Sequence, residues 1–120
     1  MKKVLTIAGS DCSGGAGIQA DLKTMSAHGV FAMSVIVSVV AENTARVISI
    51  EDISPKVIED QMDAVFEDIF PDAVKVGMLS TPPCMQAVAR KLRQYQPKHL
   101  VIDPVMYAKN GAPLMNPDAV

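Results

Sequence analysis

A glycine-rich stretch between an apolar strand and an amphipathic helix constrains this chain more than any other feature. Val4–Ala8 is a short apolar run, and Gly9–Asp21 follows it with glycines at positions 9, 14, 15 and 17. Glycine adopts positive φ without strain and lets a backbone approach another group closely. A helical pattern starts at Gly17, so the N–H groups of its first turn are available to a ligand. The stretch therefore predicts either a tight strand-to-helix turn or a ligand-binding wall. It matches neither standard nucleotide-binding fingerprint.

The alternation of apolar strands and amphipathic helices predicts an α/β fold. Val30–Val40 is a nearly continuous run rich in β-branched residues, which is typical of a strand buried on both faces of a parallel sheet. Ser54-Pro55 and Thr81-Pro82 each combine an N-cap residue with proline at the first helical position. Because helical crossovers join most of the strands, we expect a mostly parallel, helix-flanked sheet. The expected strands are Lys2–Ala8, Val30–Val40, Arg46–Ile50, Ala73–Val76 and Leu100–Val105, and the expected helices run from Gly17 to Ala27, from Pro55 to before Pro71, and from Pro82 onward.

Three residues at the ends of these strands are candidates for a binding site. In open α/β sheets, ligands bind outside the carboxyl ends of the strands. Glu42 follows the second strand and Asp103 ends the last one, although these positions equally suit a solvated carboxylate and a strand-end cap. Met78 follows Gly77 at the end of the fourth strand, where it either belongs to the core or lines the cleft.

Asp21 stands out on the first helix. At about 100° per residue it projects beside Met25, at the edge of the apolar stripe formed with Ile18 and Leu22. A carboxylate there is unfavourable unless it has a partner. It either pairs with a neighbouring backbone group or faces a cavity and binds a ligand hydroxyl. We favour the second interpretation, since Asp21 lies one turn from the glycine-rich loop.

The remaining charged residues suit solvated positions. Acidic residues of the second helix are interpreted as a solvated face, and basic residues of the third as facing water or the helix C-terminus. His28 and His99 lie at element ends, where a capping or surface role is expected. The acidic set is Asp60, Asp63, Glu67 and Asp68, and the basic set is Arg90, Lys91 and Arg93.

Composition excludes several classes of protein. A net charge of −2 without a basic stripe gives no electrostatic footprint for nucleic acid. The apolar runs are too short for a signal peptide or a membrane span, so we expect a cytoplasmic protein without membrane contact. Cys12 and Cys84 form no C-x-x-C pair and are expected to be free thiols.

Five co-linear motifs resemble one family. The segment LTIAGSD at residues 5–11 and SGGAGIQADLKT at 13–24 resemble the opening of the hydroxymethylpyrimidine and phosphomethylpyrimidine kinases. VAENT at 40–44, KVGML at 75–79 and VIDPVM at 101–106 fall where that family carries its later motifs. The resemblance spans nearly the whole chain, and several ordered motifs are far more specific than one glycine-rich loop.

The resemblance implies a ribokinase-like fold and a kinase of thiamine biosynthesis. Members phosphorylate 4-amino-5-hydroxymethyl-2-methylpyrimidine and then its monophosphate, using ATP and Mg²⁺, and the full-length enzyme is expected to be a homodimer with a small-molecule substrate. Asp103 is implied to lie near the metal and phosphates, and the loop containing Lys109 and Gly111 to act as a flap. The residues implied to line the pyrimidine pocket are Gly9, Ala16, Asp21, Val40, Glu42, Met78 and Val105.

Three positions depart from the family's pattern. The family more often has glutamine than Glu42, often has glycine at Arg46, and commonly has a smaller residue at Tyr107. These departures affect the detail of amine recognition and of the flap. Cys12 occupies a variable loop position and receives no catalytic role.

Family members are about twice as long as this chain. The resemblance therefore implies that residues 1–120 are the N-terminal part of a single ribokinase-like domain, with no complete second domain. The second half of the family supplies a Gly-rich anion hole, a catalytic cysteine base and most of the ATP site. We expect the 120-residue chain to hold most of the substrate pocket, to leave a sheet edge open, and to be inactive as a kinase by itself.

Three alternatives remain open. The first is a pyridoxal kinase of the same superfamily, whose substrate has no matching amine to donate a hydrogen bond to Glu42. A non-catalytic half-domain would bind the pyrimidine without phosphorylating it. A dinucleotide-binding fragment is less favoured, because no G-x-G-x-x-G follows the first strand.

Overall fold

The computed structural model describes residues 1–103, which form one five-stranded sheet with helices on both faces. The order of elements along the chain is the one expected from the sequence. The elements are β1 (Lys3–Asp11), α1 (Gly17–Ala27), β2 (Phe31–Glu42), β3 (Val47–Asp52), α2 (Pro55–Asp68), β4 (Ala73–Val76), α3 (Pro82–Tyr95) and β5 (Leu100–Ile102).

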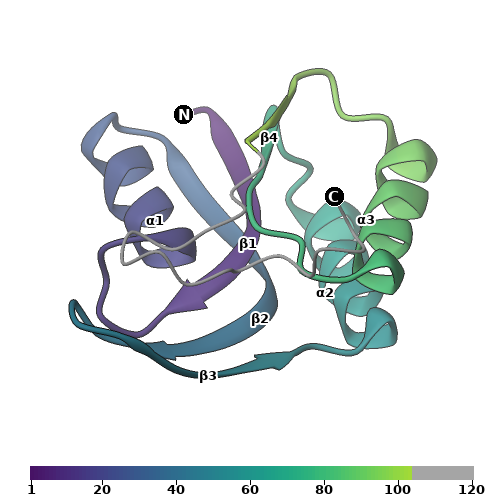
Figure 1. The fold of residues 1–120 in the computed structure, drawn as a ribbon. Coiled ribbons are helices and arrows are strands. Elements are labelled where there is room, and N and C mark those ends of the chain that lie inside the picture. Colours follow the sequence, from purple (N-terminus) through teal and green to yellow (C-terminus); the bar gives the residue numbers. More distant parts are fainter. Residues whose placement is uncertain (104–120) are drawn as a thin grey trace.

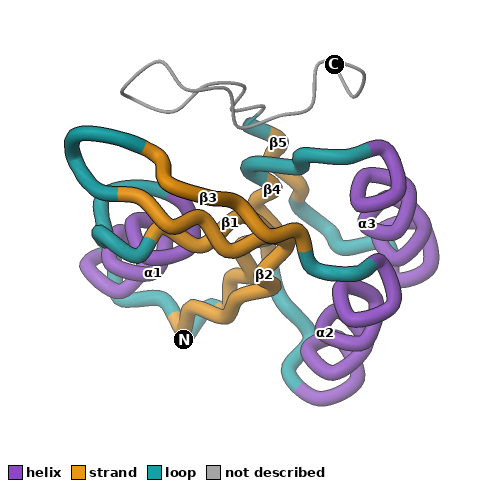
Figure 2. The backbone as a smooth tube through the Cα atoms, turned by 60° about the horizontal axis from the view of Figure 1, so that its bottom comes forward, coloured by secondary structure: helices purple, strands orange, loops and turns teal. Residues whose placement is uncertain are grey.

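The sheet has the strand order β3-β2-β1-β4-β5. The β1–β2, β1–β4 and β4–β5 pairs are parallel, and β3 runs antiparallel to β2. Helix α1 covers one face of the sheet, whereas α2 and α3 lie side by side on the other (Figures 1 and 2). The expectation of a mostly parallel, helix-flanked α/β fold is confirmed.

The apolar core lies between the sheet and the α2–α3 layer. Alternate residues of the central strands point into it, because side chains of a strand alternate between faces. Each fully buried aliphatic side chain contributes about 1.5–3 kcal/mol through the hydrophobic effect. The fully buried aliphatic residues of this cluster include Leu5, Ile7, Val35, Val37, Ile58 and Met62.

The caps and the thiols are as expected. Ser54 Oγ accepts from the N–H of Val57, and Thr81 Oγ1 accepts from that of Cys84, so both proposed helix starts are confirmed.

Among the described residues Cys12 and Cys84 are free thiols. Burial, followed by the charge of Asp52, raises the pKa of Cys84 to about 11. No helix within residues 1–103 is long and apolar enough to cross a membrane.

Three strands end later than expected, and β5 is more exposed. β2 and β3 end at Glu42 and Asp52 instead of Val40 and Ile50. β1 continues to Asp11 instead of ending at Ala8, because after an irregularity at Ala8/Gly9 it goes on pairing with Ser38–Val40 of β2. β5 was expected to be buried, but Val101 and Ile102 are each 63% exposed. The reason is that β5 pairs with β4 on one side, while its other edge has no neighbouring strand in the described part of the chain.

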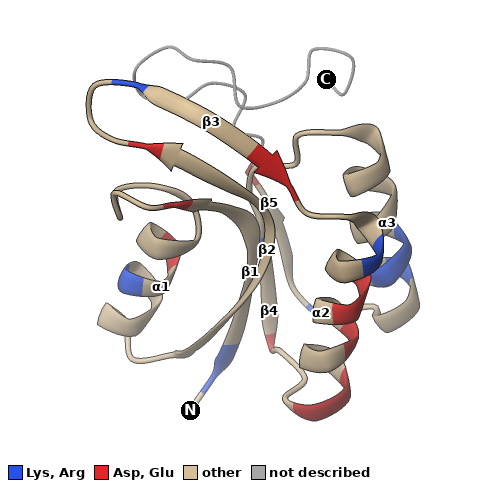
Figure 3. Ribbon diagram, turned by 90° about the horizontal axis from the view of Figure 1, so that it is seen from below, with Lys and Arg blue, Asp and Glu red and all other residues tan. Residues whose placement is uncertain are grey.

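The interpretation of the helix charges as simply solvated is wrong for Asp63 and Lys91, whose side chains pair with each other and are 30% and 15% exposed. Glu59 of α2 pairs with Arg90 of α3, and Asp63 pairs with Lys91 at 2.8 Å, so acidic α2 faces basic α3 (Figure 3). Hydrogen bonds from Lys91 and then Tyr95 lower the pKa of Asp63. The Asp63 carboxylate in turn raises the pKa of Tyr95 to about 12. Sequence periodicity places charges on a helix face but cannot show that two such faces meet.

Gln61 completes the edge of β2 where β3 has already ended. Its Oε1 accepts from the backbone N–H of Ile36 at 2.9 Å, and its Nε2 donates to the carbonyl of Ile36 at 2.9 Å. The side-chain amide thus reproduces both hydrogen bonds that a neighbouring strand would make. The contact satisfies two part-buried backbone groups and ties α2 to the sheet.

Replacing Gln61 with the nearly isosteric Met should lower the free energy of unfolding by about 1–3 kcal/mol, because both groups of Ile36 lose their partner. Urea unfolding followed by circular dichroism measures this difference. Gln86→Met on the exposed side of α3 is the matched control and should change stability by less than about 0.5 kcal/mol. Equal effects of the two substitutions would show that the amide contributes no edge pairing.

Candidate functional site

The loop between β1 and α1 is organised by the carboxylate of Asp11. Asp11 is 2% exposed, and its Oδ1 accepts from the N–H of Ser13 at 2.9 Å and from the hydroxyl of Ser13 at 2.7 Å. Its Oδ2 accepts from the N–H of Gly15 at 3.1 Å. Burial would raise the pKa of Asp11, but hydrogen bonds from Ser13, Gly15 and Ala16 outweigh it and hold that pKa below its usual value. These loop N–H groups are therefore already used by an internal anion.

Gly17 lets the start of α1 lie directly on β1. Its φ is +58°, and a Cβ added there would stand 2.2 Å from the carbonyl oxygen of Gly9. A bridge pairs Gly17 with Ser10, and Gln19 strengthens the junction from the first turn of the helix. The Gln19 amide accepts from the N–H of Asp11 at 2.8 Å and donates to Ser10 Oγ at 2.9 Å. The loop is thus a tight strand-to-helix turn, and the helix start forms one side of a concavity.

A cavity of about 80 Å³ opens beside this junction. It lies at the carboxyl ends of β1 and β2, the edge where open α/β sheets bind ligands. The family resemblance implies seven residues for the pyrimidine pocket, and five of them line this cavity. Sequence reasoning did not single out Ser10, Asp11 or Gly17 as lining residues, because it ended the first strand at Ala8. The lining residues are Gly9, Ser10, Asp11, Ala16, Gly17, Val40, Glu42 and Met78.

Glu42 lies at the end of β2 and is 8% exposed. Its backbone is held by Cys12, whose thiol donates to the Glu42 carbonyl at 3.1 Å and accepts from the Glu42 N–H at 3.4 Å. The interpretation of Glu42 as a solvated loop carboxylate is therefore wrong. Cys12 has a structural contact at the site that its sequence position did not reveal.

Asp21 is not among the residues that line the cavity. Its Oδ2 accepts from the hydroxyl of Thr6 at 2.6 Å and from Lys75 Nζ at 2.8 Å. The expected need for a partner is confirmed, but the partners are side chains of β1 and β4 instead of a backbone group. The Lys75 ammonium also lies close to Gly77, where an added Cβ would stand 2.8 Å from Nζ. A ligand-binding role for Asp21 remains a prediction.

The other implied site residues lie at or beyond the end of the described chain. Asp103 follows β5, and its N–H donates to the carbonyl of Val76 at 2.8 Å. Val105, Lys109 and Gly111 fall outside the described residues. Within residues 1–103, no group of three or more His, Cys, Asp or Glu side chains is arranged to hold a metal ion.

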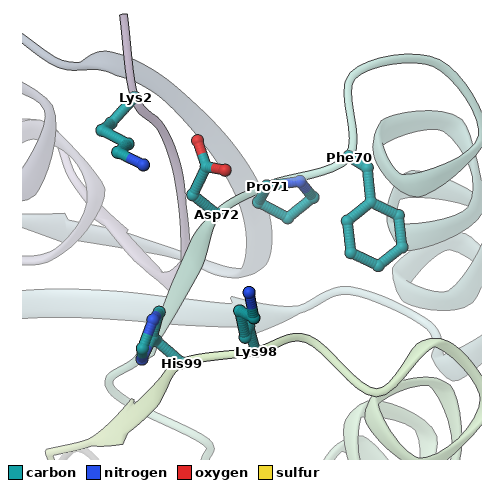
Figure 4. A pocket seen from close by; sticks show the side chains of 6 residues that line it. All are labelled: Lys2, Phe70, Pro71, Asp72, Lys98 and His99. Atoms are coloured by element: carbon teal, nitrogen blue, oxygen red, sulfur yellow. The ribbon is translucent and has the colours of Figure 1, made fainter.

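A second, larger cavity of about 270 Å³ lies at the amino-terminal ends of the strands, opposite the first cavity (Figure 4). It is located where β1, β4 and β5 begin, so it is remote from the edge at which ligands usually bind. A hydrogen bond from the Lys3 N–H lowers the pKa of Asp72 there, and that bond ties β1 to β4. We therefore assign the candidate site to the smaller cavity. The larger one is lined by Lys2, Phe70, Pro71, Asp72, Lys98 and His99.

Replacing Asp11 with Asn should lower the free energy of unfolding at pH 7 by about 1–3 kcal/mol, because the charged acceptor of the loop is lost. The lowered pKa of Asp11 means that this stabilisation is fully present above its usual value of 3.8 and is lost as pH falls further. Urea unfolding at pH 7, 5, 4 and 3 should thus show the two proteins converging at acid pH. Asp60→Asn, at an exposed helix pair, is the control and should change stability little at any pH.

Comparison with known proteins gives a consistent result over nearly the whole chain. A family model described as phosphomethylpyrimidine kinase matches residues 11–120. The hydroxymethylpyrimidine/phosphomethylpyrimidine kinase of Escherichia coli is 51% identical over 100% of this chain and 46% of its own length. The chain thus spans about half the length of the curated relatives it matches.

Solved structures support the same assignment. A crystal structure of phosphomethylpyrimidine kinase from Clostridium difficile 630 has a TM-score of 0.92 at 54% identity, over 99% of this chain and 52% of that one. An ADP complex of Bacillus subtilis pyridoxal kinase has a TM-score of 0.83 at 41% identity, over 91% of this chain and 42% of that one. These likenesses confirm the expected ribokinase-like fold. Because the family model covers almost all of the chain and these relatives share half of its residues, the chain belongs to the phosphomethylpyrimidine kinase family.

Proposed function

We propose that this chain supplies most of the substrate pocket of an ATP-dependent kinase of thiamine biosynthesis. The substrate is 4-amino-5-hydroxymethyl-2-methylpyrimidine, followed by its monophosphate. In this proposal residues 1–120 are the N-terminal part of a single ribokinase-like domain. The observation that carries the proposal is the meeting of Gly9, Ala16, Val40, Glu42 and Met78 in one cavity at the carboxyl edge of the sheet.

The chemistry of this cavity suits a small aromatic amine. Val40 is 2% exposed and Met78 is 6% exposed, and together they offer an apolar slot for a flat ring. The carboxylate of Glu42 is an acceptor for the exocyclic amine. The backbones at Gly9 and Ala16 complete the wall, and Asp11 fixes the loop before any ligand arrives. A pre-organised wall of this kind reduces the entropy lost on binding.

The same loop is poorly suited to hold the phosphates of ATP. Asp11 already accepts hydrogen bonds from the N–H groups of Ser13 and Gly15, and its negative charge would repel a phosphate. Phosphoryl transfer needs positioned cations and donors around the transferred group. Among the described residues, Asp103 after β5 is the one that we propose to lie near the metal and the phosphates. Most of the ATP site would come from residues outside 1–103.

The 120-residue chain should therefore bind 4-amino-5-hydroxymethyl-2-methylpyrimidine without phosphorylating it. Isothermal titration calorimetry measures binding, and a coupled ADP-release assay with ATP and Mg²⁺ measures turnover. Robust turnover by this chain would contradict the assignment of the phosphate machinery to other residues. Absence of any binding would contradict the substrate pocket itself.

Pyridoxal is a second candidate substrate, since a pyridoxal kinase of Bacillus subtilis shares this part of the fold. Glu42→Met should weaken binding of the aminopyrimidine by about ten- to a hundredfold, because a charged acceptor is lost, and should affect pyridoxal far less. Glu42→Gln keeps an acceptor oxygen and is the matched control. Calorimetry with both ligands tests this. Equal losses for the two ligands in Glu42→Met would reject the pyrimidine assignment.

A further inference from the structure

Ser38 of β2 carries a fully buried hydroxyl that makes no hydrogen bond within residues 1–103. Its residue is 0% exposed, and within residues 1–103 its Oγ is a buried side-chain polar atom without a hydrogen-bond partner. Buried hydroxyls are normally paired, because taking one out of water without a partner is unfavourable. In register, Ser38 lies between Gly9 of β1 and Asp52 of β3. The hydroxyl is thus located in the strand layer that carries the candidate site.

The surroundings of Ser38 connect it to the cavity. A Cβ added at Gly9 would stand 3.0 Å from Ser38 Oγ and 2.2 Å from the terminal methyl group of Met78. The hydroxyl of Ser38 and the methyl group of Met78 therefore lie on the same side of Gly9, next to the space that a side chain there would occupy. Both Gly9 and Met78 line the cavity, so Ser38 lies directly behind its wall. Methionine has three flexible side-chain bonds and adapts its packing readily, which makes Met78 a movable cover.

We propose that Ser38 is an additional specificity-determining contact of the pyrimidine pocket, reached when the side chain of Met78 moves aside for the ligand. This inference rests on the proposed function and deepens it. Ser38 lies four residues before Glu42, roughly 13 Å along the strand, so the two side chains approach a ligand from opposite ends. A ring whose amine meets Glu42 presents its opposite side to Met78 and Ser38.

The chemistry of the substrate gives Ser38 a matching partner. In a 4-aminopyrimidine, the ring atom opposite the amine-bearing carbon is a nitrogen, which can only accept a hydrogen bond. The hydroxyl of Ser38 can donate one. A pocket that hydrogen-bonds both the amine and this nitrogen would bind rings with a C–H group in place of the nitrogen more weakly, because the buried hydroxyl would stay unpaired.

The test compares two ligands in two proteins by calorimetry. One ligand is 4-amino-5-hydroxymethyl-2-methylpyrimidine, and the other is its analogue with C–H in place of the ring nitrogen opposite the amine-bearing carbon. The unchanged chain should bind the analogue about three- to tenfold more weakly, and Ser38→Ala should bind both equally. Ser34→Ala, on the same strand but away from the cavity, should keep the preference of the unchanged chain.

Stability separates a ligand contact from a structural role. The thermal midpoint of Ser38→Ala should stay the same or rise, since the substitution removes an unpaired buried hydroxyl. A Ser38→Ala variant that retains the preference for the pyrimidine would overturn the inference while leaving the proposed function intact. Failure of the unchanged chain to bind the pyrimidine at all would overturn the proposed function, and this inference with it.

Discussion

The close meeting of four segments at Gly9 is the constraint on which the rest of the site depends. The carbonyl of Gly9 lies against Gly17 at the start of α1, while its Cα lies against Met78 and Ser38. A side chain at Gly9 would displace the flexible end of Met78, whereas one at Gly17 would collide with the backbone of β1. The two glycines therefore bring the helix start, β1, β2 and the segment after β4 close enough to enclose the cavity.

Two carboxylates near this junction, those of Asp11 and Asp21, are held by partners within the fold. Asp11 satisfies the N–H groups of the glycine-rich loop from inside, which makes the loop a rigid wall. Asp21 is tied to Lys75 and Thr6, so it links α1 to the sheet. Glycine-rich loops before a helix often hold phosphate, but an internal carboxylate gives this loop a different electrostatic character. This difference is why we place the substrate here and the phosphates elsewhere.

Side-chain groups repeatedly replace missing strand neighbours. Gln61 hydrogen-bonds both backbone groups of Ile36 beyond the end of β3, and the thiol of Cys12 does the same for Glu42 beyond the end of β1. Both contacts satisfy polar groups at sheet positions where pairing stops. The second contact fixes the backbone of a residue that lines the cavity, so the geometry of the site depends on how the sheet ends.

The sequence by itself determined the order of elements, the helix caps at Ser54 and Thr81, and the candidate residues at strand ends. These follow from local signals: apolar periodicity, capping side chains and glycine positions. Only the tertiary structure decided that β1 continues to Asp11, that Asp63 pairs with Lys91, that Asp21 is held by Lys75, and that Ser38 lies behind Met78. Each of these depends on which segments, distant in the chain, are brought side by side by sheet pairing and helix packing. Local sequence patterns do not specify such contacts.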